Sequence, residues 1–331
     1  MDPLDSSNSK PDARPTTGSS PQGISADLVA VLVAVTSGEP RVLTIQDQRA
    51  LPSGPFELAH RSLQSGLRAW VERQTQLPLG YVEQLYTFAD RDRAGATTQH
   101  AISISYLGLT REQPALGQHE ARWRGWYDYF PWEDHRVGPP PLMEKTLRPR
   151  LKAWVSAAPD RAAQRARRQR AAMLFGLDEH SWNEELVLQR YELLYEARLI
   201  PEATRGNSST STSTHAALSN TPGHPMILDH RRILATGIAR LRAKIKYHPV
   251  VFELMPDTFT LLQLQRCVEA LAGRQVHKPN FRRLIEQQEL VEETGETSQD
   301  TGGRPAKLFR FRRAVLAERA IAGTKLPVSG A

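Results

Sequence analysis

A short run of basic and amide side chains in the C-terminal part of the chain has the residue types that bind nucleic acid. The run comprises His277, Lys278, Asn280, Arg282 and Arg283. Lys and Arg neutralise phosphates and release counterions, and Asn and Arg can pair with base edges in the major groove of DNA. These residues therefore predict a segment that contacts double-stranded DNA, provided that they share the exposed face of one helix.

The residues around this run predict two helices joined by a tight turn. Thr260 suits the N-cap of the first helix, and Gly273 can end that helix in the left-handed conformation. Pro279 suits the first turn of the second helix. The apolar positions at helical spacing are Leu261, Leu264, Val268 and Leu271, then Phe281, Leu284 and Ile285. This order predicts a helix-turn-helix, with Arg274 of the turn also facing DNA.

Two strand-like segments, 290–294 and 304–311, follow the second helix and flank a polar, Gly-rich loop. They predict a β-hairpin wing, which would place Arg304 and Lys307 against phosphates or the minor groove. The alternative is a small helical packing module whose basic face contacts only solvent.

The N-terminal half has an α+β pattern. An apolar, β-branched run and a second strand flank a Gly-Glu-Pro turn, and a helix and two more strands follow. The predicted strands are 28–35, 41–45, 81–89 and 101–109, and the predicted helix is 63–74.

The segment 51–73 resembles the Nudix box, a motif in which several glutamates hold Mg²⁺. Gly54 opens the box, but His60, Ala69 and Arg73 stand where the family has Glu, and only Glu72 remains. Mg²⁺ needs several hard oxygen ligands, so the resemblance implies the Nudix fold, an α/β/α sandwich, without a metal site, a cofactor or hydrolysis. Arg68 lies four residues before Glu72, which predicts a structural ion pair between them.

The combination of a degenerate Nudix box and a winged helix resembles the Nudix-related transcriptional regulators of NAD metabolism. The resemblance rests on segments 81–88, 252–260, 280–283 and 303–308, and the aromatic segment 123–132 is closer to the alphaproteobacterial NAD regulators. It implies a dimeric repressor of NAD biosynthesis or salvage genes that binds a DNA operator. An NAD-related nucleotide (NAD, ADP-ribose or ATP) would be its effector. The candidate effector contacts are Arg68, Glu72, Arg91 and Arg93.

The region between these halves is predicted to be mostly helical. Residues 145–170 hold nine Lys or Arg, which could form a solvated helix face or a face that contacts phosphates. The aromatic residues of 123–132 could form an apolar plug between domains or a wall for a ligand. Segment 229–247 has one apolar stripe and is predicted to be a helix that enters the last domain.

Composition shifts along the chain predict its domain organisation. The predicted units are a disordered tail (1–23), a degenerate Nudix-like domain (24–135), a helical connector (136–250) with a flexible Ser/Thr loop at about 204–225, a winged helix-turn-helix (251–315) and a C-terminal tail (316–331).

The net charge and the cysteine content limit the classes of function that the chain can have. The net charge of +7 suits a polyanionic partner, and the single cysteine, Cys267, excludes an internal disulfide or a cysteine metal cage. With neither a secretory signal nor an apolar run long enough to span a bilayer, the sequence predicts a cytoplasmic protein.

One alternative function is an active Nudix pyrophosphatase with an accessory DNA-binding domain, which would need a compensating acid such as Glu57 or Glu83. Another is a basic RNA-binding or nucleoid-associated protein without sequence preference.

Overall fold

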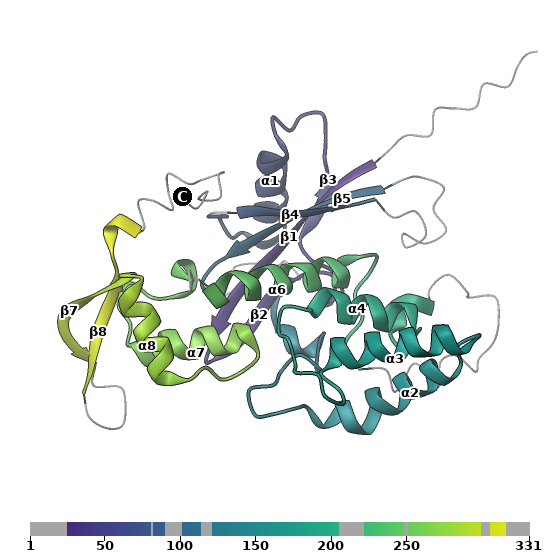
Figure 1. Ribbon diagram of the computed structural model, residues 1–331. Coiled ribbons are helices and arrows are strands. Elements are labelled where there is room, and N and C mark those ends of the chain that lie inside the picture. The colour runs from purple at the N-terminus through teal and green to yellow at the C-terminus, as the bar shows by residue number, and fades with distance from the viewer. Residues whose placement is uncertain are drawn as a thin grey trace, which may run out of the picture.

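A six-stranded mixed sheet lies at the centre of the molecule (Figure 1). This computed structural model describes residues 25–80, 82–89, 101–113, 121–204, 222–247, 251–298 and 305–315. The strands run in the order β4 (Val82–Phe88), β5 (Ala101–Leu109), β1 (Ser25–Thr36), β2 (Glu39–Thr44) and β6 (Arg122–Gly125), and β3 (Ser53–Pro55) pairs with β1. β1 and β5 are parallel and the other paired strands are antiparallel.

The central strand β1 supplies side chains to both faces of the sheet. Leu28, Ala30 and Leu32 belong to one buried cluster, whereas Val29, Val31 and Val33 belong to the other. Successive side chains of a strand point to opposite faces, so a strand buried on both sides is apolar at every position. The continuous apolar run in the sequence thus forms the central layer of a sandwich.

Helix α1 (Leu63–Thr75) covers one face of this sheet. Ser62 and Ser65 form a reciprocal capping box at its N-terminus, and Gln76 ends it in the left-handed conformation. Leu67 and Val71 are fully buried under the helix. The predicted helix and the four predicted strands of this half are confirmed, and the short strands β3 and β6 are additions that apolar periodicity did not indicate.

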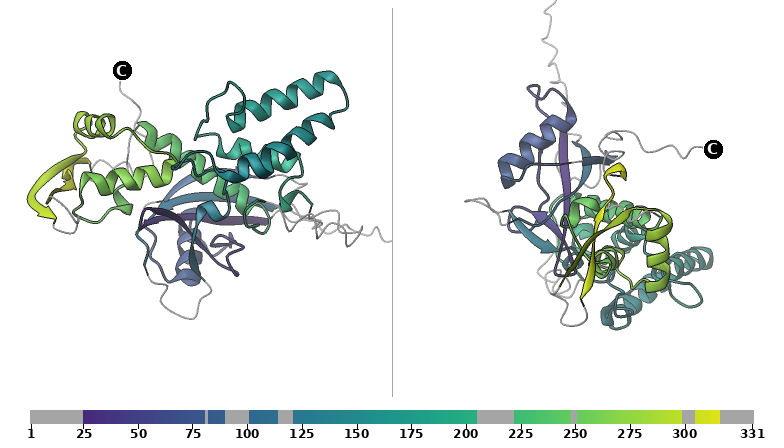
Figure 2. Two further views of the ribbon diagram at one scale, coloured as in Figure 1. Left: turned by 90° about the horizontal axis from the view of Figure 1, so that it is seen from below. Right: turned by 90° about the vertical axis from the view of Figure 1, so that its left-hand side faces the viewer.

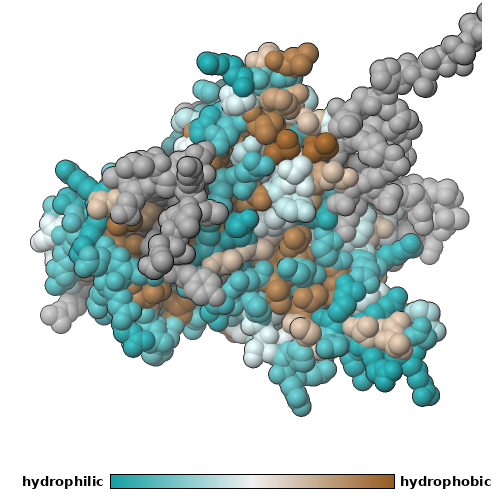
Figure 3. Space-filling view, turned by 45° about the horizontal axis from the view of Figure 1, so that its top comes forward, coloured by the Kyte–Doolittle hydropathy of each residue, from teal (hydrophilic) through white to brown (hydrophobic). Residues whose placement is uncertain are grey.

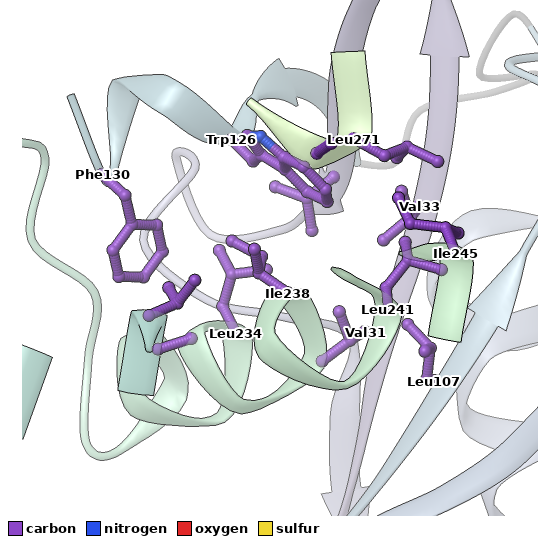
Figure 4. Packing of buried hydrophobic residues seen from close by; sticks show 14 of the residues in the cluster. Val31, Val33, Leu107, Trp126, Phe130, Leu234, Ile238, Leu241, Ile245 and Leu271 are labelled. Atoms are coloured by element: carbon purple, nitrogen blue, oxygen red, sulfur yellow. The ribbon is translucent and has the colours of Figure 1, made fainter. Parts of the chain in front are cut away.

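Helix α6 (His230–Tyr247) covers the opposite face, although it follows β6 by about a hundred residues. Figure 4 shows Leu234, Ile238, Leu241 and Ile245 of α6 packed toward Val31, Val33 and Leu107 of the sheet. Each such aliphatic side chain contributes about 1.5–3 kcal/mol when fully buried. The helix also contacts α7. The expectation that it only enters the last domain was therefore incomplete, because α6 is the second helical layer of the α/β/α sandwich.

The segment between β6 and α6 is helical, as predicted. It contains α2 (Arg148–Ser156), α3 (Arg161–Phe175) and α4 (Val187–Glu196), and a π-helical turn, Met143–Leu147, precedes α2. Asp160 caps α3 by accepting from the Ala163 amide, and Gly176 ends it with φ near 59°. Short 3-10 turns occupy Trp126–Asp128, Pro201–Thr204 and Phe252–Leu254.

The aromatic segment after β6 is an internal packing element. Trp126, Tyr129, Phe130 and Trp132 are fully buried, each with 0% exposure, in the cluster that joins the sheet, α4 and α6. A side chain without exposed surface cannot line a ligand site. The apolar plug is therefore confirmed for these four residues, and the alternative of a ligand wall is wrong for them.

The C-terminal part forms a winged helix. It consists of α7 (Leu261–Ala272), α8 (Lys278–Gln287) and the hairpin β7 (Val291–Ser298) and β8 (Ala306–Phe311). Thr260 and Gln263 form a capping box, and Gly273 ends α7 with φ of 70°, as the sequence predicts. Phe259 exchanges two backbone hydrogen bonds with Phe309, so the wing is fixed to the start of α7.

Several predictions fall on residues outside those that the structure describes. They are the N-terminal tail, Arg91, Arg93, Arg304, most of the Ser/Thr loop and the C-terminal tail beyond residue 315. Among the described helices, none is long and apolar enough to cross a membrane.

Candidate nucleic-acid interface

Helix α8 carries the predicted DNA-contacting residues on one exposed face. Phe281 and Ile285 are buried in the main core on the opposite face, and α8 contacts α7. His277, Lys278, Asn280, Arg282 and Arg283 are all exposed. The charged residues among them form no ion pair with any described residue. Their positive charge is therefore available to an external anion.

The N-terminus of α8 adds a second feature that favours an anion. His277 occupies the N-cap without a side-chain capping bond, and Pro279 lies in the first turn. The first-turn amides of such a helix lack intrahelical acceptors and lie at the positive end of the helix dipole. Together with Lys278, this end of α8 is suited to a phosphate.

Arg274 was also predicted to contact DNA, but its side chain is paired within the protein. Its guanidinium forms an ion pair of 2.9 Å with Glu184, whose carboxylate is almost completely buried. Arg274 therefore joins the helix-turn-helix turn to the segment before α4. A direct DNA contact by Arg274 would have to break this pair.

Three cations in the described part of the wing form ion pairs. Lys307 bonds Glu293 at 2.9 Å, Arg310 bonds Glu292 at 2.7 Å and Arg312 bonds Glu289 at 2.8 Å. Each pair offsets the attraction of its cation for a phosphate. Lys307 is thus exposed, as a DNA contact requires, but is less available than the cations of α8.

This pairing predicts that the wing acidic residues lower DNA affinity. We expect Glu293→Gln to strengthen duplex binding by up to about fivefold, since an exposed pair is worth up to about 1 kcal/mol. Lys307→Ala should weaken binding less than Lys278→Ala does. Gel-shift titrations at one salt concentration measure both effects, and a Lys307→Ala loss as large as that of Lys278→Ala would contradict the prediction.

Side chains of α1 within and next to the Nudix-box segment, including the substituted Arg73, hold the loop that begins this segment. Trp70 packs over Gly54 so closely that a Cβ on Gly54 would lie 2.2 Å from the indole, and the Trp70 Nε1–H donates to the Pro55 carbonyl at 2.9 Å. The guanidinium of Arg73 lies 4.5 Å from the centre of the Trp70 ring. Gln74 exchanges two hydrogen bonds with the Ser53 backbone. The loop before α1 is therefore held by an indole and an amide side chain.

Arg68 and Glu72 do not form the predicted ion pair. The Arg68 guanidinium donates to the Leu79 carbonyl and, at 2.8 Å, to the Gly80 carbonyl, so it fixes the segment that leads to β4. The i, i+4 spacing failed as a guide because two backbone carbonyls lie within reach of the long Arg side chain. Glu72 is exposed on α1. Among the described residues, no group of three His, Cys, Asp or Glu side chains is arranged to hold a metal ion.

Sequence patterns missed a buried ionic cluster between the sheet, α4 and α6. Glu133 accepts from Arg190 at 2.6 and 2.8 Å and from Arg242 at 2.6 Å, and all three side chains have 0% exposure. Other N–H groups of the two arginines donate to backbone carbonyls, including those of Leu174 and Glu184, and Arg242 also donates to the Tyr127 hydroxyl. The only indication of this cluster in the sequence is that single charged residues occur within otherwise apolar segments.

This cluster directly contacts the turn between α7 and α8. Arg242 donates to the Leu271 carbonyl at 3.0 Å, and the His135 amide donates to the Gly273 carbonyl at 2.7 Å. A Cβ on Gly273 would lie 2.4 Å from the Glu133 carbonyl oxygen. The helix-turn-helix turn and the sandwich are therefore packed as one unit around these charges.

The protonation states of the cluster follow from burial and charge. Burial alone would favour the neutral Glu133 carboxyl, but Arg190 and Arg242 outweigh it and hold the pKa of Glu133 below its usual range. Burial lowers the pKa of His135 to about 4. The His135 ring, stacked on Trp182 with 3.7 Å between ring centres, is therefore neutral at neutral pH.

Comparisons with known proteins agree with this architecture. Residues 251–311 match the family model described as the NrtR DNA-binding winged helix domain. A segment of 86 residues, 26% of this chain, is 40% identical to the ADPR responsive transcriptional repressor NtrR of Acinetobacter baylyi. That match spans only 34% of the relative's length, about a third.

Solved structures share the fold over most of the chain. Shewanella oneidensis NrtR complexed with a 27mer DNA aligns with a TM-score of 0.51 and 18% identity, over 87% of this chain and 93% of that chain. A MutT/nudix family protein from Enterococcus faecalis aligns with a TM-score of 0.50 and 15% identity, over 90% of each chain. This chain therefore combines a Nudix-like fold with a C-terminal winged helix, and its residues 251–311 match the NrtR DNA-binding winged helix domain.

Proposed function

We propose that this protein is a transcriptional repressor that binds an operator through α8 and is controlled by an NAD-related nucleotide bound to its Nudix-like half. Its targets would be genes of NAD biosynthesis or salvage. As a homodimer, it would place two α8 helices in major grooves one helical turn, or a multiple of it, apart.

The observation that carries this proposal is the exposed, unpaired basic face of α8. Lys278, Arg282 and Arg283 are charged residues without described ionic partners, and they lie in a domain that matches a DNA-binding family. Arg can make bidentate contacts to guanine, and Asn280 can do so to adenine. This set supports base readout in addition to phosphate contact.

ADP-ribose is the effector that we propose first. The Acinetobacter baylyi relative is named as ADPR responsive, and the sandwich of this chain supplies a Nudix-like fold in which a nucleotide could bind. Glu72, on the exposed face of α1, remains the candidate contact from this helix. Arg91 and Arg93 stay candidates as well. Arg68 would have to exchange its carbonyl acceptors for a ligand, so it is a weaker candidate.

A selection experiment tests the DNA-binding part of the proposal. The full chain is incubated with a pool of random-sequence duplexes, and the retained DNA is amplified and sequenced over several rounds. The proposal predicts that a palindromic site is enriched and competes at least about a thousandfold better than random duplex. A pool that stays random after these rounds would show a chain without sequence preference.

We also propose that the Nudix-like half has no hydrolase activity. Hydrolysis by this fold requires several carboxylates on Mg²⁺, and His60, Ala69 and Arg73 stand at the glutamate positions. We expect the native chain to bind ADP-ribose without cleaving it, with or without Mg²⁺. Chromatographic detection of AMP would contradict this prediction, and Ala69→Glu with Arg73→Glu is the variant in which Mg²⁺ binding should appear by calorimetry.

A further inference from the structure

The hairpin of α2 and α3 has a basic surface that the winged helix does not include. Within the described residues, six cations of the hairpin and of the π-helical turn before it form no ion pair or side-chain hydrogen bond, whereas Arg148 pairs with Glu144 and Arg170 with Glu196. We call these six residues the hairpin cations: Lys145, Arg150, Lys152, Arg161, Arg165 and Arg168. Figure 3 shows hydrophilic side chains gathered at the lower right, over α2 and α3.

Three of the hairpin cations form a row on one side of α3. Arg161, Arg165 and Arg168 are spaced by four and three residues, so they lie on the same exposed face. Like charges at this spacing destabilise a helix by about 0.2–0.5 kcal/mol per pair. No described acidic side chain compensates them. Such a row is suited to an external polyanion.

The hairpin is held rigidly enough to present this row. Arg167 of α3 donates to the Trp154 carbonyl of α2 at 2.9 Å, and its guanidinium lies 4.7 Å from the centre of the Trp154 ring. Asp160 caps α3, and Phe175 buries its other end in the main core. A row of charges on a fixed helix has a lower entropic cost of binding than charges on a flexible segment.

The hairpin and α8 project from the same side of the molecule. In both views of Figure 2, α8 and the α2–α3 hairpin lie on the side of the sheet away from α1, and in the left-hand view they lie at opposite ends of that side. A linear polyanion that contacts α8 can therefore extend toward α3. Duplex DNA, with one negative charge per about 1.7 Å of helix axis, has the required charge density and stiffness.

We infer that the α2–α3 hairpin is a second DNA-contacting element, which binds the phosphates flanking the site that α8 contacts. The inference rests on the proposed function. The row consists of arginines, and it lies on an exposed helix outside the winged helix. We assign these arginines to phosphates, so their expected contribution is to affinity and to salt dependence.

The test compares two duplex lengths with the full chain. One duplex contains only the enriched site, and the other has the same site with 20 random base pairs on each side. The variant Arg161→Gln/Arg165→Gln/Arg168→Gln keeps the helix and removes three charges. The matched control, Arg49→Gln/Arg61→Gln/Arg122→Gln, removes three exposed charges from the sheet and the α1 side.

The result expected is a loss confined to the long duplex. Each phosphate contact contributes about 0.9 to the slope of log affinity against log salt, so removing three contacts lowers the slope by about 2.7. Between 50 and 200 mM salt, the wild-type affinity for the long duplex should fall about 40-fold more than that of the α3 variant. The short duplex and the control variant should keep wild-type behaviour.

Three results would overturn the inference. An α3 variant that matches wild type on the long duplex, while Arg282→Ala/Arg283→Ala abolishes binding, would remove the second contact and leave the proposed function intact. An equal loss in the control variant would assign the effect to net charge. A wild-type chain that binds neither duplex would remove the proposed function and the inference together.

Discussion

Replacing Glu133 by Gln is expected to lower the free energy of unfolding by about 3–5 kcal/mol, which is typical of breaking a buried ion pair. Gln keeps the volume of the side chain but removes the charge that compensates Arg190 and Arg242. Both guanidinium groups would remain fully buried with neutral acceptors only. Denaturant unfolding followed by tryptophan fluorescence measures the loss, because Trp126, Trp132 and Trp182 lie in or beside this core.

Glu144→Gln is the matched control for this substitution. Glu144 also pairs with an arginine, Arg148, but both side chains are exposed, so its loss should cost less than about 1 kcal/mol. A Glu133→Gln protein as stable as this control would contradict the importance of the buried cluster.

The free energy of unfolding of the wild type should fall as the pH drops below 4.5. The folded-state pKa of Glu133 is lowered, so the stabilisation by its charge is lost as the carboxyl is protonated.

The double substitution Arg282→Ala/Arg283→Ala is expected to weaken binding to the enriched duplex at least about 30-fold. Each Arg that contacts a base contributes about 1–3 kcal/mol, and both residues lie on the exposed face of α8 without ionic partners. The fold should be unaffected, because Phe281 and Ile285 make the buried contacts of α8. Gel-shift titration and circular dichroism measure the two outcomes.

The control for the α8 variant removes the same charge elsewhere. Arg49→Ala/Arg122→Ala takes two exposed cations from the sandwich, and it should retain duplex binding within about twofold at physiological salt, since exposed charges far from DNA are screened. If the two double variants weakened binding equally, net charge rather than α8 would explain the affinity.

Local patterns predicted the elements of the winged helix because each is set by neighbouring residues. The Thr260 cap, the left-handed Gly273 and two of the three apolar positions of α8, Phe281 and Ile285, have the predicted roles, whereas Leu284 is only partly buried. The apolar run of β1 likewise marked a strand buried on both faces. Wherever the determining contacts lie within one turn or one strand, sequence patterns were sufficient.

Contacts between distant segments were not predictable from these patterns. The Glu133 cluster joins residues 57 and 109 positions apart, and α6 packs on a sheet whose last strand ends at Gly125. Arg68 and Arg274 were expected to face ligands, but they bond the Gly80 carbonyl and the Glu184 carboxylate. A long cationic side chain bonds the acceptors that the tertiary fold places within its reach, and local sequence patterns do not identify these acceptors.

The central claim is that a nucleotide bound to the Nudix-like half controls binding of DNA by α8. The most direct measurement is a fluorescence anisotropy titration of the enriched duplex with the full chain, in the absence and presence of saturating ADP-ribose. We predict that ADP-ribose changes the dissociation constant by about 5- to 150-fold, the usual range of coupling between two sites. Equal affinities with and without ADP-ribose, with calorimetry showing that the nucleotide is bound, would contradict the account.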